Sequence, residues 1–271
     1  MQAVNEHSEI PDSGAVQFRG LLAEEFDALD LVIDDTQRAL KKLRPGSESE
    51  VMRLALGQRS LLLLHGARLL LEEGHWEIAA GVVRQMFEVL VNVEHLLNQS
   101  DTEAAWKSYR TYGEAQLLQA SLRKMKYAIA TGYIDEAARV EALEATLKDA
   151  QFDEFRHPKG HIRDSWSGLS VGKLAEASRV TWRTGQYRYY YRSWSEQAHG
   201  SSSSLINSVA PRTPRSPRSE EYAAFAREAR QEIAMIVELA ADLTSALGIF
   251  GSKYGTTVRG WRELLSRKAS E

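Results

Sequence analysis

The sequence contains no cysteine among its 271 residues. Disulfide bonds, zinc sites built on thiolates and a cysteine nucleophile are therefore excluded by composition. Chains without disulfides are typical of reducing compartments, and we expect a cytoplasmic protein.

Long apolar runs are also absent. The most apolar stretch, residues 78–97, is interrupted by Arg84, Glu88, Glu94 and His95, whereas a membrane-spanning helix needs about 20 nearly uncharged residues. Residues 1–14 are polar and acidic, whereas a secretory signal is basic and then apolar. The sequence therefore predicts neither a membrane span nor export by that route.

Strong charge imbalance and the common metal and nucleotide motifs are missing as well. The net charge of -3 gives no global electrostatic signal for nucleic acid. A di-metal bundle would need two Glu-x-x-His pairs on inward faces, but Glu72–His75 crosses a glycine and Glu154–His157 abuts Pro158. No Walker loop, dinucleotide fingerprint or Gly-x-Ser-x-Gly elbow occurs. We expect no metal site and no cofactor.

Helical periodicity is the dominant positive signal. Apolar residues recur at three- and four-residue spacing, and Ser47 with Glu50 and Ser100 with Glu103 fit capping boxes. No useful length shows the two-residue alternation of strands, and no fixed-period repeat is present. The sequence predicts an all-α protein, a single bundle of about seven to nine helices. The helices are expected near residues 18–43, 47–74, 76–98, 100–132, 135–155, 170–178, 186–198, 222–247 and 259–267.

Composition also divides the chain. We expect residues 1–15 to form a flexible N-terminus and residues 16–271 to form one helical domain. Residues 200–219 contain four consecutive serines and three prolines, which predicts a long mobile loop. The role of the Arg-Pro part of this loop, residues 211–218, is left open.

Two polar stripes stand out on helices that are otherwise apolar. On the third expected helix, four polar residues share one face: Arg84, Glu88, Asn92 and His95. They form either a solvated strip with one weak ion pair or, if covered by other helices, paired charges of the kind that mark a site.

The second stripe lies between residues 186 and 199 and contains Arg188, Tyr191, Arg192, Ser195, Glu196 and His199. The structural interpretation is an aromatic surface packed on its neighbours, with His199 at the helix C-terminus, where a cation is favoured. Arg192 and His199 also fit the Arg-to-His spacing of ribonucleases of the HEPN class. Three other pairs in the chain fit it too, namely Arg59–His65, Arg68–His75 and Arg156–His161, so spacing alone does not decide.

Three ordered segments then resemble a known family. They read Arg-Gln-Met-Phe-Glu at 84–88, Ile-Arg-Asp-Ser-Trp-Ser-Gly-Leu at 162–169 and Tyr-Tyr-Arg-Ser-Trp-Ser-Glu-Gln-Ala-His-Gly at 190–200. Together they are similar to the bacterial domain-of-unknown-function family DUF5677, over about residues 54–205. The resemblance implies a helical fold and a site, without an established activity. The matching positions are Arg84, Glu88, Trp166, Tyr191, Ser195 and His199.

Three functional hypotheses follow. In the first, the protein is a binding or sensing module in a stress or phage-defence setting, and both stripes form a polar pocket in which Arg84 and Arg192 hold a small anionic ligand. In the second, it is a metal-independent HEPN-like ribonuclease that acts on RNA as a homodimer, with His199 as general acid/base and Arg192 stabilising the phosphorane. In the third, the stripes are ion pairs that only stabilise the fold. We also expect Glu88 and His199 to lie within communicating distance.

Overall fold

The computed structural model of this chain describes residues 22–73, 75–133, 136–198 and 220–249. Within these ranges it contains nine α-helices, one 3-10 helix and one π-helix, and no strand. One isolated antiparallel bridge joins Arg156 and Ile162. The predicted all-α class is therefore confirmed.

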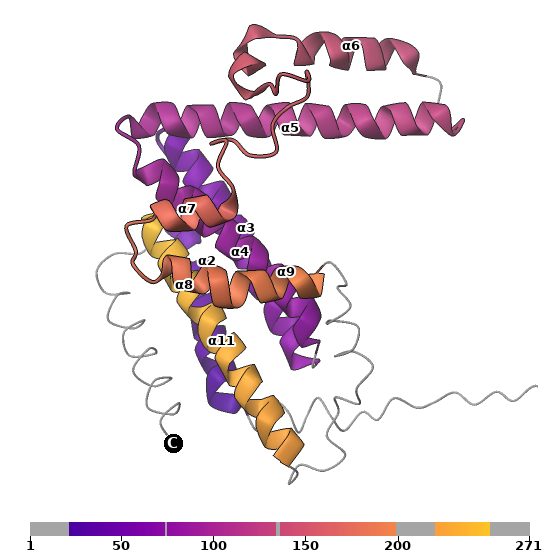
Figure 1. Cartoon of the computed structure of the whole chain (residues 1–271). Coiled ribbons are helices and arrows are strands. Elements are labelled where there is room, and N and C mark those ends of the chain that lie inside the picture. The colour runs from indigo at the N-terminus through magenta and orange to yellow at the C-terminus, as the bar shows by residue number, and fades with distance from the viewer. Residues whose placement is uncertain (1–21, 74, 134–135, 199–219, 250–271) are drawn as a thin grey trace, which may run out of the picture. The chain divides into compact units, whose positions relative to one another are not determined.

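The described elements succeed one another along the chain as labelled in Figure 1. Their bounds are α2 Ala23–Lys42, α3 Glu48–Glu72, α4 Trp76–Leu97, α5 Thr102–Ala130, α6 Ala137–Leu147, the 3-10 helix η1 Ala150–Phe155, α7 Val171–Ala177, α8 Arg183–Gln186, the π-helix η2 Tyr187–Tyr191, α9 Arg192–Ala198 and α11 Glu220–Ala246. The predicted N-terminal segment 1–15, the loop 200–219 and the helix 259–267 lie outside the described residues. Among the helices that are described, none combines the length and apolarity needed to span a bilayer.

Local side-chain chemistry sets several helix ends. At the start of α3 the amide of Ser47 donates to the Glu50 carboxylate at 3.2 Å and the amide of Glu50 donates to the Ser47 hydroxyl at 3.3 Å, which confirms this capping box. The second predicted capping box is wrong. Asp101 caps α5 by accepting from the amide of Ala104 at 2.9 Å, while Glu103 accepts from the hydroxyl of Ser49 at 2.6 Å.

The single helix predicted for residues 135–155 is also wrong. Helix α6 ends at Leu147, and the 3-10 helix η1 starts three residues later. The Asp149 side chain accepts from the amide of Gln151 at 3.0 Å. An aspartate that hydrogen-bonds the backbone locally competes with the helical ladder, so the α-helix stops there.

The chain divides into two compact units. Of the described residues, the first unit contains those within 22–44, 54–93 and 185–249, and the second contains those within 45–53 and 94–184.

The first unit draws its core from α2, α3, α4 and α11. Helices α2 and α11 lie side by side (Figure 1). Arg230 of α11 donates at 2.6 Å to Glu25, a buried carboxylate of α2, and Arg68 of α3 donates at 3.0 Å to Asp30 of α2. Fully buried side chains from the four helices include Phe26, Leu29, Leu64, Leu71, Met86, Phe87, Leu90, Ile233, Ile236 and Leu243.

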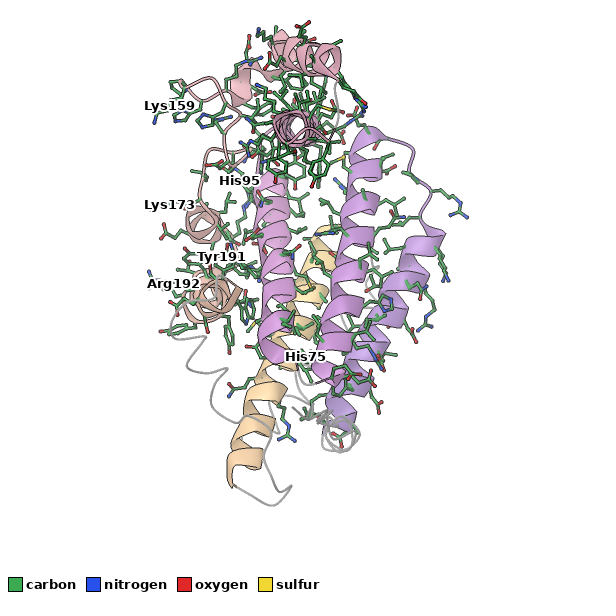
Figure 2. The ribbon with its side chains drawn as sticks, turned by 90° about the vertical axis from the view of Figure 1, so that its right-hand side faces the viewer. His75, His95, Lys159, Lys173, Tyr191 and Arg192 are labelled. Carbon is green, nitrogen blue, oxygen red and sulfur yellow. The ribbon has the colours of Figure 1, made fainter. Side chains whose placement is uncertain are left out.

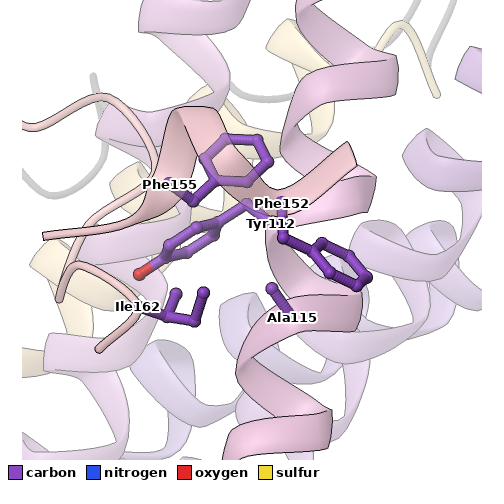
Figure 3. Close-up of a cluster of buried hydrophobic side chains, with 5 residues drawn as sticks. All are labelled: Tyr112, Ala115, Phe152, Phe155 and Ile162. Atoms are coloured by element: carbon purple, nitrogen blue, oxygen red, sulfur yellow. The ribbon is translucent and has the colours of Figure 1, made fainter. Parts of the chain in front are cut away.

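The second unit is built around α5, which has α6 along one side (Figure 1). Figure 3 shows its cluster of buried side chains, formed by Tyr112, Ala115, Phe152, Phe155 and Ile162. The hydroxyl of Tyr112 donates to the backbone oxygen of Arg163 at 2.9 Å and so ties the following loop to α5. Burial along α5 ends at Ala115, and α6 contains no buried residue.

The segment from Arg183 to Ala198 is not one regular α-helix, contrary to the prediction for residues 186–198. The π-helix η2 separates α8 from α9, and the amide of Arg192 donates to the oxygen of Tyr187, five residues back. A π-turn accommodates one residue more than an α-turn. Such turns occur frequently at functional sites.

The extra residue of the π-turn lets two side chains, one on each side of it, contact the same helix, α11. Gln186 donates at 3.4 Å to Glu238, and the indole of Trp194 donates at 3.0 and 3.1 Å to Glu232. In a regular α-helix, residues eight apart point about 80° apart, whereas residues seven apart point within about 20° of each other. Gln186 and Trp194 are eight residues apart, but the π-turn takes up one extra residue. The two side chains therefore point in directions close to those of residues seven apart in an α-helix, and both contact α11.

Gly57 of α3 marks a close helix approach and gives a first prediction. A Cβ atom there would lie 2.5 Å from Ile249 Cδ1 and 2.7 Å from Leu40 Cδ2. Gly66 in the same helix has only Val82 Cγ1 at 3.9 Å. We expect Gly66→Ala to gain about 0.5–1 kcal/mol from helix propensity, and Gly57→Ala to be less stable than Gly66→Ala by about 1–3 kcal/mol because buried side chains must move. Urea unfolding of both variants measures this, and equal stabilities would contradict the close approach.

The π-turn gives a second prediction. Tyr189 lies inside η2 with 78% of its surface exposed, so deleting it should convert the π-turn into an α-turn and keep both contacts with α11. We expect this deletion to cost less than about 2 kcal/mol. Deletion of Leu62, which is 66% exposed in the regular helix α3, should prevent folding because it rotates the following core residues by about 100°. Circular dichroism with thermal unfolding compares the two deletions, and an unfolded Tyr189 deletion would refute the register argument.

Candidate functional site

The candidate site starts on α4 with an ion pair. Arg84 and Glu88 are four residues apart and therefore lie on one face of the helix. The distance between Arg84 Nε and Glu88 Oε1 is 3.1 Å, and the two side chains remain 22% and 36% exposed. They are thus covered on one side and open to solvent on the other.

Tyr191, the last residue of the π-helix, completes this group. Its hydroxyl donates to Glu88 Oε1 at 2.7 Å. The Arg84 guanidinium lies over its ring, with Cζ 5.2 Å from the ring centroid, which is the geometry of a cation–π contact. Tyr191 is 7% exposed. Its ring stacks on that of Tyr187, with 5.3 Å between the ring centroids, and contacts the ring of Phe87 of α4, with 5.4 Å between the centroids.

Burial and hydrogen bonding set the charges of Tyr191 and Arg84. Burial, followed by the hydrogen bond to Glu88, raises the pKa of Tyr191 to about 12. For Arg84, burial lowers the pKa, but the contacts with Tyr191 and Glu88 outweigh it and the pKa is raised. Near neutral pH the site therefore contains a neutral phenol and a guanidinium cation beside a carboxylate.

The structure separates the other residues of the two predicted stripes. Asn92 turns its amide back to donate to the backbone oxygen of Glu88 at 2.7 Å. Arg192, labelled with Tyr191 in Figure 2, is exposed, and Ser195 is partly exposed one turn beyond Tyr191. His199 lies outside the described residues, and with it the expected proximity of Glu88 and His199.

Trp166 belongs to the second unit, where it forms its own aromatic group. Its ring makes edge contacts with His95 at 5.5 Å and with Tyr109 at 5.6 Å. Burial lowers the pKa of His95, which favours the neutral imidazole. His95 also contacts the Gln99 amide nitrogen at 3.2 Å. Within the second unit, Trp166 therefore packs with one predicted stripe residue, His95.

One buried ion pair was not predicted from the sequence. Arg183 is fully buried in the second unit and donates to both carboxylate oxygens of Glu94, at 2.6, 3.1 and 3.2 Å. Ser178 donates to the same carboxylate at 2.7 Å. The available signal was Glu94 itself, a charge in the most apolar stretch of the chain, but nothing in the spacing pointed to Arg183.

The described residues contain no group of three or more histidine, aspartate or glutamate side chains arranged to hold a metal ion. Arg84, Glu88 and Tyr191 can form hydrogen bonds and charge pairs.

Comparison with known proteins places the chain in a family. Searches among curated proteins and among solved structures find no match. A family model described as a family of unknown function, DUF5677, matches residues 52–214, close to the range 54–205 expected from the three sequence segments. The match contains Arg84, Glu88, Trp166 and Tyr191. Because it spans more than half of the chain, this protein belongs to the DUF5677 family.

Proposed function

We propose that this protein is a binding or sensing module whose recognition site consists of Arg84, Glu88 and Tyr191. The ligand is a small molecule with an anionic group that Arg84 holds. The observation that carries the proposal is a cation and a carboxylate fixed side by side by a buried phenol, with both charged side chains still open to solvent. We place this activity in the cytoplasm, in line with the cysteine-free sequence.

The electrostatics favour recognition over proton transfer. A general base works best when its pKa lies near the working pH. With a pKa of about 12, Tyr191 stays protonated under ordinary conditions and acts as a hydrogen-bond donor. The raised pKa of Arg84 keeps its guanidinium cationic under the same conditions. Fixed charges and a fixed donor are the groups that orient a ligand in a binding site.

The burial of Tyr191, together with its hydrogen bond to Glu88, predicts an alkaline titration. The folded state raises the pKa of Tyr191 above its ordinary value of about 10, so the stability gained is fully present below about pH 10 and is lost as the pH rises through about 12. The difference in phenolate absorbance between wild type and Tyr191→Phe should titrate near pH 12. Tyr112, whose pKa burial also raises to about 12, cancels in this difference.

Glu88→Gln provides the control for that titration, since it removes the charge that disfavours the phenolate. We expect it to lower the pKa of Tyr191. A difference spectrum that titrates near pH 10 in the wild type would contradict the buried, hydrogen-bonded position of Tyr191.

The binding function itself is tested by thermal shift with a panel of phosphorylated metabolites, nucleotides, organic acids and amino acids. A ligand at roughly 100 times its Kd adds about 2.7 kcal/mol, which shifts the melting temperature by several degrees. We expect at least one compound to shift the wild type and to lose its effect in Arg84→Gln. Arg59→Gln is the matched control, because Arg59 is an exposed arginine on α3 that contacts only Gln85 among the described residues.

Two outcomes would count against this function. One is a panel in which no compound shows a shift that depends on Arg84. The other is cleavage of a mixed RNA substrate in EDTA that is lost in His199→Ala, which would favour the HEPN-like ribonuclease instead.

A further inference from the structure

The site presents both signs of charge at one place, and this restricts the ligand. Arg84 Nε and Glu88 Oε1 are 3.1 Å apart. A ligand group that contacts one of the two side chains therefore also interacts electrostatically with the charge of the other. The contacts of the Glu88 carboxylate with Arg84 and with Tyr191 both use Oε1. Oε2 of Glu88 is therefore the oxygen that we assign to a donor group of the ligand.

A ligand with a single negative charge gains little from such a pair. At about 4 Å, two unit charges interact by about 1 kcal/mol in bulk water and by about 4 kcal/mol near a protein surface. For an anion placed beside the pair, attraction by Arg84 and repulsion by Glu88 are of similar size and largely cancel. A ligand with a cation next to its anion turns the repulsive interaction into a second attractive one.

We propose that the ligand is a zwitterion of the α-amino acid type. Its carboxylate pairs with Arg84 and its ammonium donates to Glu88 Oε2. In such a molecule the ammonium nitrogen and the carboxylate are attached to the same carbon atom, which suits two opposite charges on adjacent turns of α4. This inference rests on the proposed binding function and names the chemical class of its ligand.

The chain also contains a control for the idea that any adjacent ion pair would suffice. Arg110 and Glu114 on α5 have the same four-residue spacing and a distance of 2.9 Å. Their side chains are 50% and 46% exposed, against 22% and 36% for Arg84 and Glu88. Water competes strongly for side-chain charges with such a high exposure, so the ion pair and any ligand contact with it are weakened. Arg84 is in addition held over the ring of Tyr191, which keeps its guanidinium in one place.

The test compares free amino acids with derivatives that have one charge removed. Isothermal titration calorimetry is run with wild-type protein and the free α-amino acids, their N-acetyl derivatives and their carboxamides. We expect at least one free amino acid to bind, and both of its derivatives to bind at least about tenfold more weakly, which corresponds to about 1.4 kcal/mol. Because this comparison uses wild-type protein, it does not depend on the folding of any variant.

Variants then assign each charge. In Glu88→Gln, the preference for the free amino acid over its N-acetyl derivative should fall by about tenfold, and in Arg84→Gln the preference over the carboxamide should fall likewise. Glu114→Gln should change neither preference. Circular dichroism checks that each variant is folded.

The outcomes distinguish this inference from the proposed function. If an N-acetyl amino acid binds as tightly as the free one and still requires Arg84, the ligand is an anion and the zwitterion is wrong, while the binding function stands. If the free amino acid binds equally well to Arg84→Gln, the zwitterion occupies another place and the inference is wrong. If neither the amino acids nor the wider metabolite panel bind in a way that requires Arg84, both proposals fail.

Discussion

Two carboxylates on α4 impose the main constraint on this structure. Glu88 and Glu94 belong to a helix whose other side chains are mostly apolar and buried. A carboxylate that loses water must recover hydrogen bonds and opposite charge, because an unpaired charge in such a place costs several kcal/mol. Each is satisfied within its own unit, Glu88 by Arg84 and Tyr191 and Glu94 by Arg183 and Ser178. Residues 178–191 thus contribute a partner to both carboxylates.

The two carboxylates are satisfied in different ways, and the difference bears on function. Glu94 meets a fully buried arginine in a bidentate pair, which is costly to break by removing one partner. Glu88 keeps about a third of its side-chain surface in contact with solvent. Chemically similar pairs therefore differ in exposure: the Glu94 pair is enclosed within its unit, and the Glu88 pair is the one to which we assign the proposed ligand contact.

Helix positions were largely predictable, because periodicity and capping are local properties of the sequence. The errors also have local causes. The N-cap of α5 is Asp101 and not the predicted Ser100. The two residue types are about equally good N-caps and stand at adjacent positions. The π-turn at Tyr187–Tyr191 could not be predicted, since it is set by contacts with Glu232 and Glu238 of a distant helix. The candidate site was predicted in part. Spacing placed Arg84 and Glu88 on one face of a helix, but only the fold shows that Tyr191 joins them.

The uneven burial along α5 affects how the second unit can vary. Its buried residues end at Ala115, although the helix continues to Ala130, and α6 beside it buries none. Core packing therefore restricts substitutions in the first half of α5 far more than in the second half or in α6. Leu117, Tyr127 and Tyr133, all large and largely exposed, lie in the less restricted part. On packing grounds, substitutions in this part of the unit should be tolerated better than substitutions in the cluster around Tyr112.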